Sequence, residues 1–206
     1  MLPVLLVSAL AVAAPVGFRI VPAQSRIGFD AKSTLHDFKG TTNQVFGAFR
    51  LDWDRLGETQ VAVRVAADQL ATGNASRDEE MKKKRLETAR FPAIRFEARR
   101  MEVRESDPKA GTAKAAIRGT LFIHGVQKEV AVEASLAPLE GGAVRVRGTA
   151  PLDIRDFGIT PPRVMLFVKM DPKVIVTFDL RADRVADADW DAAWKAADLP
   201  APPARK

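Results

Sequence analysis

Cysteine is absent from the 206-residue chain. Its absence excludes disulfide bonds, thiolate metal sites and a cysteine nucleophile, but it does not assign a cellular compartment. Histidine is scarce, with His36 and His124 as the two imidazoles of the chain. No zinc, P-loop or serine-elbow motif is present in the sequence. Enzyme classes built on those groups therefore have no support from the sequence.

The sequence also lacks an apolar run long enough to span a bilayer. Residues 1–18 carry no charged side chain, but their apolar run is shorter than the roughly 20 residues that a transmembrane helix needs. The small residues around Ala11 to Ala14 resemble the cleavage context of a secretory signal peptide, although a basic n-region is missing. We expect residues 1–16 to be a signal peptide and the protein to be periplasmic or secreted. An uncleaved membrane tether and an incorrect start site are the alternatives.

Apolar and polar residues alternate along most of the remaining chain, which is the period of half-buried strands. Strands are predicted at residues 27–31, 45–53, 61–67, 94–103, 113–123, 130–136, 144–152 and 164–180. The apolar phase slips by one residue between Ala98 and Met101, which predicts a β-bulge near Arg99 and Arg100. Antiparallel strands with one apolar face bury it by pairing two sheets or by closing a barrel.

Two helices are predicted outside this pattern. Ser76 followed by Glu79 is a capping-box pattern that predicts a helix start, and Pro92 prevents the helix from continuing. This segment, 76–90, is expected to flank the entrance of a barrel. A second helix is predicted at 187–198, where Trp190 and Trp194 share one face and pack on the outside of the sheet.

The apolar phase of the strands predicts the lining of an interior. Gly47, Gly119 and Gly148 fall in this phase and reduce the side-chain volume available, which favours a hollow. An eight-stranded barrel is either filled by side chains or wide enough for one slender ligand. A hydrocarbon chain would match its lining, for which we select Phe29, Phe49, Val63, Val65, Phe96, Ile117, Leu121, Val132, Val146 and Phe178. The alternative is a filled barrel that serves as an interaction module.

Four segments, in this order along the chain, resemble signature segments of the YceI-like family. They are residues 76–78 (SRD), 86–96 (LETARFPAIRF), 119–126 (GTLFIHGV) followed by Lys128, and 156–159 (DFGI). The chain departs from the commonest pattern at Gln24-Ser25, where many members carry His-Ser, and at residues 34–40, where members show a His-Leu-Gly-like run. These departures lie in a region expected near a barrel mouth. The identity of the ligand's head group is therefore the part of the resemblance that they leave open.

The resemblance implies a lipocalin-like antiparallel barrel at residues 17–183. With the residue pattern it predicts an all-β fold with a short inserted helix, a single antiparallel eight-stranded barrel, and a C-terminal helix and tail at 184–206. It also implies a lumen that holds a polyisoprenoid or a similar long-chain amphiphile. The leading hypothesis is therefore an exported lipid-binding protein that sequesters or carries an isoprenoid or acyl lipid. We expect it not to be an enzyme and to use no cofactor and no metal. The sequence leaves its oligomeric state open.

The remaining polar residues allow a second hypothesis, an enzyme acting on such an amphiphile with His36 and His124 as acid–base groups. Both histidines lie in predicted turns, where hydrogen bonding to the backbone is the simpler role. The basic run at residues 82–85 and the net charge of +6 favour ordinary solvation, transient contact with an anionic membrane surface, or the binding of a diphosphate head group. Nucleic acid is not expected as a partner, because exposed aromatics are not interleaved with these charges.

Overall fold

The computed structural model describes residues 15–164 and 168–197. The predicted leader, apart from its last two residues, and the chain end beyond residue 197 lie outside the described residues. Within the described part the α-helices are α1 (Ala75–Glu80) and α2 (Trp190–Ala197), and the rest is mostly strand. The strands are β1 (Val16–Ile20), β2 (Arg26–Ser33), β3 (Phe38–Thr42), β4 (Val45–Leu51), β5 (Gln60–Ala66), β6 (Ala93–Asp107), β7 (Thr112–Ile123), β8 (Val126–Pro138), β9 (Val144–Asp153), β10 (Arg163–Val164) and β11 (Val168–Val185).

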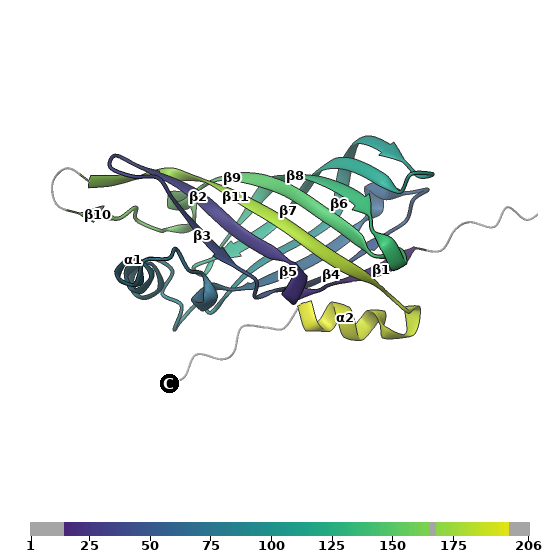
Figure 1. The fold of residues 1–206 in the computed structure, drawn as a ribbon, viewed down its shortest axis with the longest axis horizontal. Helices are drawn as coiled ribbons and strands as arrows, with labels where there is room; N and C mark the ends of the chain where they lie inside the picture. Colours follow the sequence, from purple (N-terminus) through teal and green to yellow (C-terminus); the bar gives the residue numbers. More distant parts are fainter. Residues whose placement is uncertain (1–14, 165–167, 198–206) are drawn as a thin grey trace, which may run out of the picture.

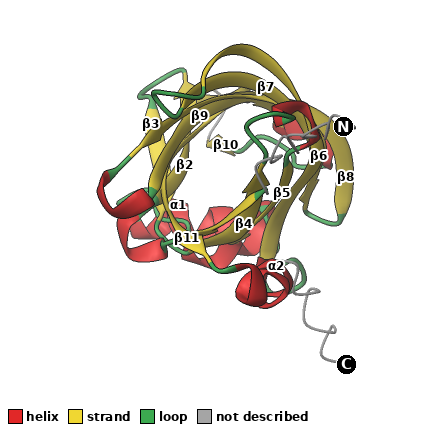
Figure 2. Ribbon diagram, turned by 90° about the vertical axis from the view of Figure 1, so that its right-hand side faces the viewer, coloured by secondary structure: helices red, strands yellow, loops and turns green. Residues whose placement is uncertain are grey.

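Eight of these strands close into an antiparallel barrel. Their order is β1-β4-β5-β6-β7-β8-β9-β11, and β1 pairs with β11 to complete the ring. The closed ring is visible end-on in Figure 2. Two extra strands extend the wall, because β2 continues alongside β11 after β1 ends and pairs with β3 on its other side. The predicted eight-stranded antiparallel barrel is confirmed.

Strand β1 was not among the predicted strands. Phe18 and Ile20 are buried while Arg19 between them is exposed, so the strand does alternate. Its first three residues belong to the uncharged N-terminal run, which hides so short an alternation. The predicted bulge in β6 is confirmed, since its register with β7 shifts between Glu97 and Arg100.

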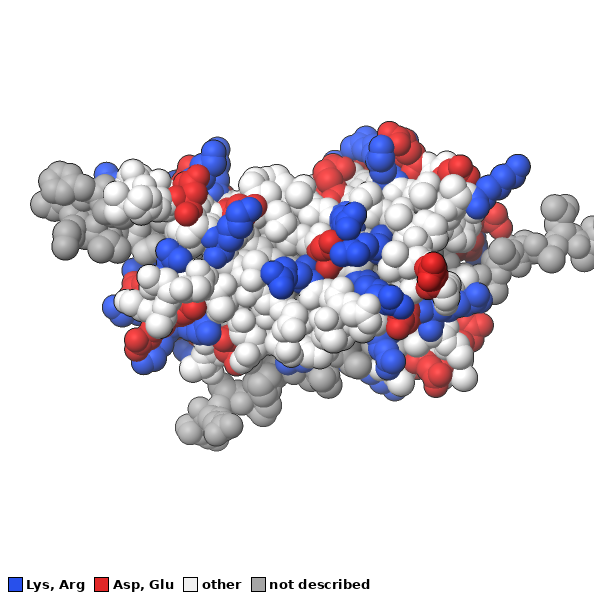
Figure 3. All heavy atoms as spheres, in the orientation of Figure 1, with Lys and Arg blue, Asp and Glu red and all other residues white. Residues whose placement is uncertain are grey.

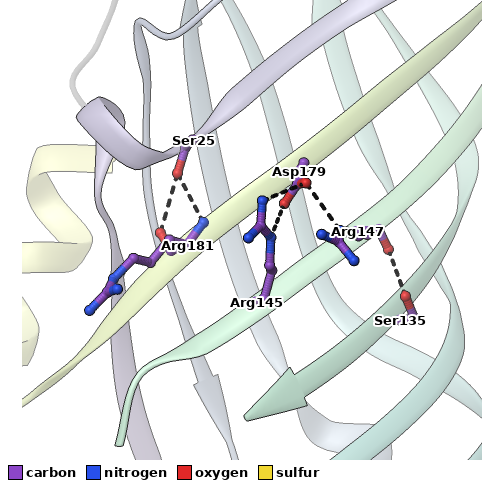
Figure 4. Close-up of polar contacts among 6 residues, drawn as sticks. All are labelled: Ser25, Ser135, Arg145, Arg147, Asp179 and Arg181. Atoms are coloured by element: carbon purple, nitrogen blue, oxygen red, sulfur yellow. Dashed lines mark hydrogen bonds and ion pairs between the residues drawn. The ribbon is translucent and has the colours of Figure 1, made fainter. Parts of the chain in front are cut away.

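The outer face of the wall is charged where the inner face is apolar. On β11, Phe178 and Leu180 belong to the interior, and Asp179 between them faces outward. Figure 4 shows Arg145 and Arg147 of β9 reaching this carboxylate, and the Arg147 Nε–Asp179 Oδ2 distance is 3.0 Å. Hydrogen bonding from Arg145 is the main cause that lowers the pKa of Asp179. Figure 3 shows both signs of charge spread over one face of the molecule.

One end of the barrel is filled by apolar side chains, and we call it the packed end. The rings of Phe18 and Phe49 stack there with centroids 5.2 Å apart. Leu56, on the short 3₁₀ helix Leu56–Glu58 between β4 and β5, is buried in the same cluster. The buried Asp52 carboxylate accepts hydrogen bonds from the Asp54 N–H and from the Arg55 side chain, which fixes the entry into this turn.

Helix α2 packs on the outside of the barrel, as predicted, and lies below β4 and β1 in Figure 1. Trp190 and Ala193 cover Ala48 of β4. A Cβ atom on Gly17 would come within 2.8 Å of the Trp190 indole, so this glycine lets the ring lie against β1. In the part of the chain that the structure describes, no helix has the length and apolar character needed to cross a membrane.

Candidate functional site

The barrel encloses a cavity of about 210 Å³, which we call the lumen. Almost every residue that lines it is apolar. The ten side chains selected from the alternation all lie on it: Phe29, Phe49, Val63, Val65, Phe96, Ile117, Leu121, Val132, Val146 and Phe178. Several of them, such as Ile117 and Val132, remain partly accessible although they face inward. The interior is therefore hollow rather than filled.

Two of the three wall glycines, Gly119 and Gly148, make room for aromatic rings, whereas the side chain of Ile20 lies against Gly47. A Cβ atom on Gly119 would be 2.6 Å from Cζ of Phe96, and the Phe178 ring covers Gly148 in the same manner. The rings rest against the wall because the glycines leave room for them, and a larger residue would push each ring into the lumen.

The opposite end from the packed end carries a second pocket of about 880 Å³, which we call the mouth. Helix α1 and the π-helical turn Met81–Arg85 that continues it form one side of the mouth. Figure 1 shows α1 at this end of the barrel. The mouth and the lumen share six lining residues: Phe29, Leu70, Ile94, Ile123, Leu152 and Val176. The two spaces therefore adjoin. Unlike the lumen, the mouth is lined by charged side chains, Arg77, Glu80, Lys84 and Arg85. It is also lined by the polar side chains Ser33, His36, Asn74 and Ser76.

The start of α1 differs from the prediction. Asn74, not Ser76, is the N-cap, and its Oδ1 accepts a hydrogen bond from the Arg77 N–H at 3.0 Å. Ser76 lies inside the first turn, so its pairing with Glu79 in a capping box was wrong. Either side chain satisfies the same requirement for an acceptor at a helix start, and Asn is as favourable there as Ser. Asp78 accepts hydrogen bonds from the backbone and side chain of Thr72, which anchors the helix beside the mouth.

His124 joins three segments of the chain at the mouth end. Its Nε2 lies 3.0 Å from Oε1 of Glu87, and its Nδ1 lies 3.2 Å from the carbonyl oxygen of Phe157. The ring of Phe91 packs edge-on against the imidazole, with centroids 5.0 Å apart. The hydrogen bond from His124 is the main cause that lowers the pKa of Glu87, and Arg90 adds to it. The predicted backbone contact of His124 is confirmed, and its contact with Glu87 was missed.

The two histidines do not form a catalytic pair. In residues 15–164 and 168–197, no hydrogen bond, ion pair or ring contact joins His36 to His124. His36 lies in the exposed loop at the β2–β3 turn, and both ring nitrogens of His124 already have partners. Within the same residues, no group of three or more His, Asp or Glu side chains is arranged to hold a metal ion. The arrangement gives no support to the acid–base hypothesis.

The basic run before Leu86 is partly neutralised by its own helix. Lys83 pairs with Glu79 at 2.7 Å, and Lys84 pairs with Glu80 at 2.9 Å. Hydrogen bonding from Lys83 lowers the pKa of Glu79, and that from Lys84 lowers the pKa of Glu80. This part of the run matches the solvated helix face that the sequence allowed.

Comparison with known proteins places this architecture in a family. The model of the YceI-like domain matches residues 18–182. The chain belongs to the YceI-like family. Three of the four segments on which the resemblance rested, 86–96, 119–126 and 156–159, meet at His124 in this YceI-like barrel, because Glu87, His124 and Phe157 each belong to one of them. No curated protein sequence matches the chain.

Solved structures share the YceI-like fold at low sequence identity. BcnA of Burkholderia cenocepacia aligns with a TM-score of 0.69 at 16% identity, over 80% of this chain and 99% of its own. A polyisoprenoid binding domain from Saccharophagus degradans aligns with a TM-score of 0.64 at 14% identity, over 82% and 98% of the two chains. The YCEI protein of Campylobacter jejuni gives 0.58 at 16%, over 75% and 88%. At these identities the likeness establishes the fold.

Proposed function

We propose that this protein binds one long-chain isoprenoid or acyl lipid in its lumen and stores or carries it without chemical change. The observation that carries the proposal is a hollow, almost wholly apolar lumen that adjoins a polar mouth. A hydrocarbon chain gains about 0.8 kcal/mol for each CH₂ group that it transfers from water into such an environment. The structural relative described as a polyisoprenoid binding domain supports this class of ligand.

The direct test is to purify the protein from its native host without detergent and to extract it with organic solvent. Mass spectrometry of the extract should show isoprenoid or acyl lipid at about one molecule per chain. The same extraction applied to an unrelated protein from the same host corrects for lipid that adheres nonspecifically. A lipid-free extract from well-folded protein would contradict the carrier function and favour a barrel that serves as an interaction module.

Replacing either of two alanines of β8 by tryptophan distinguishes an effect on lipid binding from an effect on folding. Ala134 lines the lumen and Ala131 is exposed on the outer face of the same strand. Ala134→Trp should fill part of the lumen and lower the bound lipid several-fold, at a cost in stability of about 1–3 kcal/mol. Ala131→Trp adds the same side chain outside and should leave the lipid content unchanged. Equal lipid content in both variants would contradict a ligand in the lumen.

Export is the second part of the proposal. It is supported by the uncharged residues 1–18 and their small residues near Ala13. Expression of the full chain in a Gram-negative host should give a periplasmic protein whose new N-terminus lies close to residue 14. A full-length protein that stays in the cytoplasm would contradict export. Transfer of the lipid would then need transient contact with an anionic membrane, with which the net charge of +6 is compatible.

A further inference from the structure

A row of arginine and phenylalanine side chains crosses the outer face of the barrel wall, over strands β4 to β7. Arg64 of β5 lies directly opposite Arg95 of β6, and the register continues the row to Phe46 on one side and to Phe122 on the other. The residues before and after Arg64, Arg95 and Phe122 line the lumen, so these three side chains point outward. Phe46 shares their face, because residues directly opposite one another in a sheet point to the same side. We call these four half-exposed residues the arginine row.

The two arginines of the row are not neutralised by the chain itself. Among the described residues, no ion pair or side-chain hydrogen bond involves the guanidinium group of Arg64 or Arg95. The contact made by Arg95 is with the ring of Phe122, whose centroid lies 4.8 Å from its Cζ atom. Glu97 follows on the same face of β6 and does not pair with the row in that part of the chain. Like charges directly opposite one another destabilise an antiparallel pair, so the stability of the barrel does not explain the row.

The arginine row lies beside the opening of the barrel. Arg95 follows Ile94 and Phe122 precedes Ile123, and these two isoleucines line both the lumen and the mouth. The row is therefore at the level where the two spaces adjoin, on the opposite face of β6 and β7. A surface that contacts the row has the mouth next to it.

We propose that the arginine row is the surface by which this protein docks on an anionic membrane. The inference rests on the proposed function, in which the bound lipid passes between the lumen and a membrane. Unpaired guanidinium groups are attracted to acidic lipids, and phenylalanine rings enter the boundary between head groups and acyl chains. Single-stranded nucleic acid also binds arginines mixed with aromatic residues, but it needs free ring faces for stacking. The guanidinium group of Arg95 already occupies a face of the Phe122 ring, which favours the membrane.

The test measures how the purified full chain sediments with vesicles of phosphatidylcholine, with and without phosphatidylglycerol. The wild type should bind the vesicles that contain phosphatidylglycerol, and added salt should weaken this binding because it screens the charges. The double variant Arg64→Gln/Arg95→Gln should bind these vesicles at least ~10-fold more weakly. Its melting temperature should not fall, because the substitutions relieve the like-charge pair.

The matched control is Arg145→Gln/Arg147→Gln. It removes the same charge from the outer face of β9, which lies across the ring from β5. This variant should bind the vesicles nearly as tightly as the wild type. Equal losses in the two double variants would overturn the inference, because net charge alone would then explain the binding.

Two outcomes distinguish the docking surface from the carrier function. A wild type that carries lipid but does not bind the anionic vesicles would overturn the docking surface alone. A wild type without bound lipid that still binds the vesicles through Arg64 and Arg95 would support the docking surface and contradict the carrier function. Single-stranded DNA that displaces the wild type from the vesicles, and does not bind Arg64→Gln/Arg95→Gln, would overturn the inference in favour of a nucleic-acid surface.

Discussion

The packed end and the mouth of the barrel are formed by different kinds of residue. At the packed end, Phe18 and Phe49 are 5% and 6% exposed and stack on each other. At the mouth, the loop between β2 and β3 carries Leu35, which is 64% exposed, and charged residues of α1 and of the turn Met81–Arg85 line one side of the opening. The strands that connect the two ends are the same. The two ends differ in the side chains that lie at each opening, which are apolar at the packed end and partly charged at the mouth.

This comparison shows how one barrel can be both stable and accessible. Burial of large apolar side chains supplies most of the stability of a fold. Such burial is present at both ends, with Phe18 and Phe49 at the packed end and Phe157 and Leu121 near the mouth. Segments with few buried contacts open most easily, and such a segment at the mouth gives a ligand access without unfolding the wall. The mouth therefore differs from the packed end in its exposed loop and charged lining, and both ends contain a buried apolar cluster.

The largest effect should come from truncating an aromatic ring at each end. Phe49→Ala removes a buried, stacked ring from the packed end and should lower the free energy of unfolding by about 3–5 kcal/mol. Phe38→Ala removes a half-buried ring beside Arg77 at the mouth and should cost less than half as much. Denaturant unfolding of both variants measures the difference. Equal losses would remove the contrast between the two ends.

A smaller effect is expected from the junction at His124. His124 has a positive φ of 52°, so asparagine, which tolerates this conformation, is the appropriate replacement. His124→Asn should lose the side-chain bond to Glu87 and lower the free energy of unfolding by about 1–2 kcal/mol. His36→Asn, in the exposed loop, should change it by less than about 0.5 kcal/mol. Thermal unfolding compares the two, and an equally small change in both would mean that His124 does not join its three segments.

The smallest effect is a difference in acid sensitivity. Arg155 hydrogen bonds to Asp153, near the mouth, and lowers the pKa of this carboxyl from 3.8 to about 2. Because the pKa is lowered in the folded state, the pair stabilises the fold above pH 3.8 and loses this contribution as the pH falls towards about 2. Asp153→Asn should therefore show a shallower fall of the melting temperature between pH 4 and 2 than the wild type. Glu129→Gln, an exposed control, should keep the wild-type slope, and a wild-type slope in Asp153→Asn would contradict the role of the pair.

Much of the barrel could be predicted because strands have a short, fixed period. A side chain two positions along a strand returns to the same face, so the apolar phase of β5, β7 and β8 identified the lining directly. The bulge in β6 could also be located, because a bulge shifts the phase of the pattern that follows it. The placement of all ten selected residues on the lumen follows from this local rule.

Other features depend on contacts between distant segments and left no local signal. Asn74 and Ser76 are both suitable N-caps, and only the path of the chain into α1 decides between them. The Phe96 ring covers Gly119 of a neighbouring strand, so the effect of that glycine on the lumen depends on strand register. By contrast, the ion pairs of Lys83 with Glu79 and of Lys84 with Glu80 follow from their i,i+4 spacing on one helical segment.

The sequence by itself determined the strand pattern, the apolar lining and the family resemblance, because each of these is written in residues that are adjacent or at fixed spacing. Only the tertiary structure decided that the interior is hollow, that one end is packed, and that Arg77 and Arg85 lie at the opening of the lumen. Those features depend on where side chains from separate strands and from α1 end up relative to one another. Ring closure fixes that arrangement, and no local stretch of the chain encodes it.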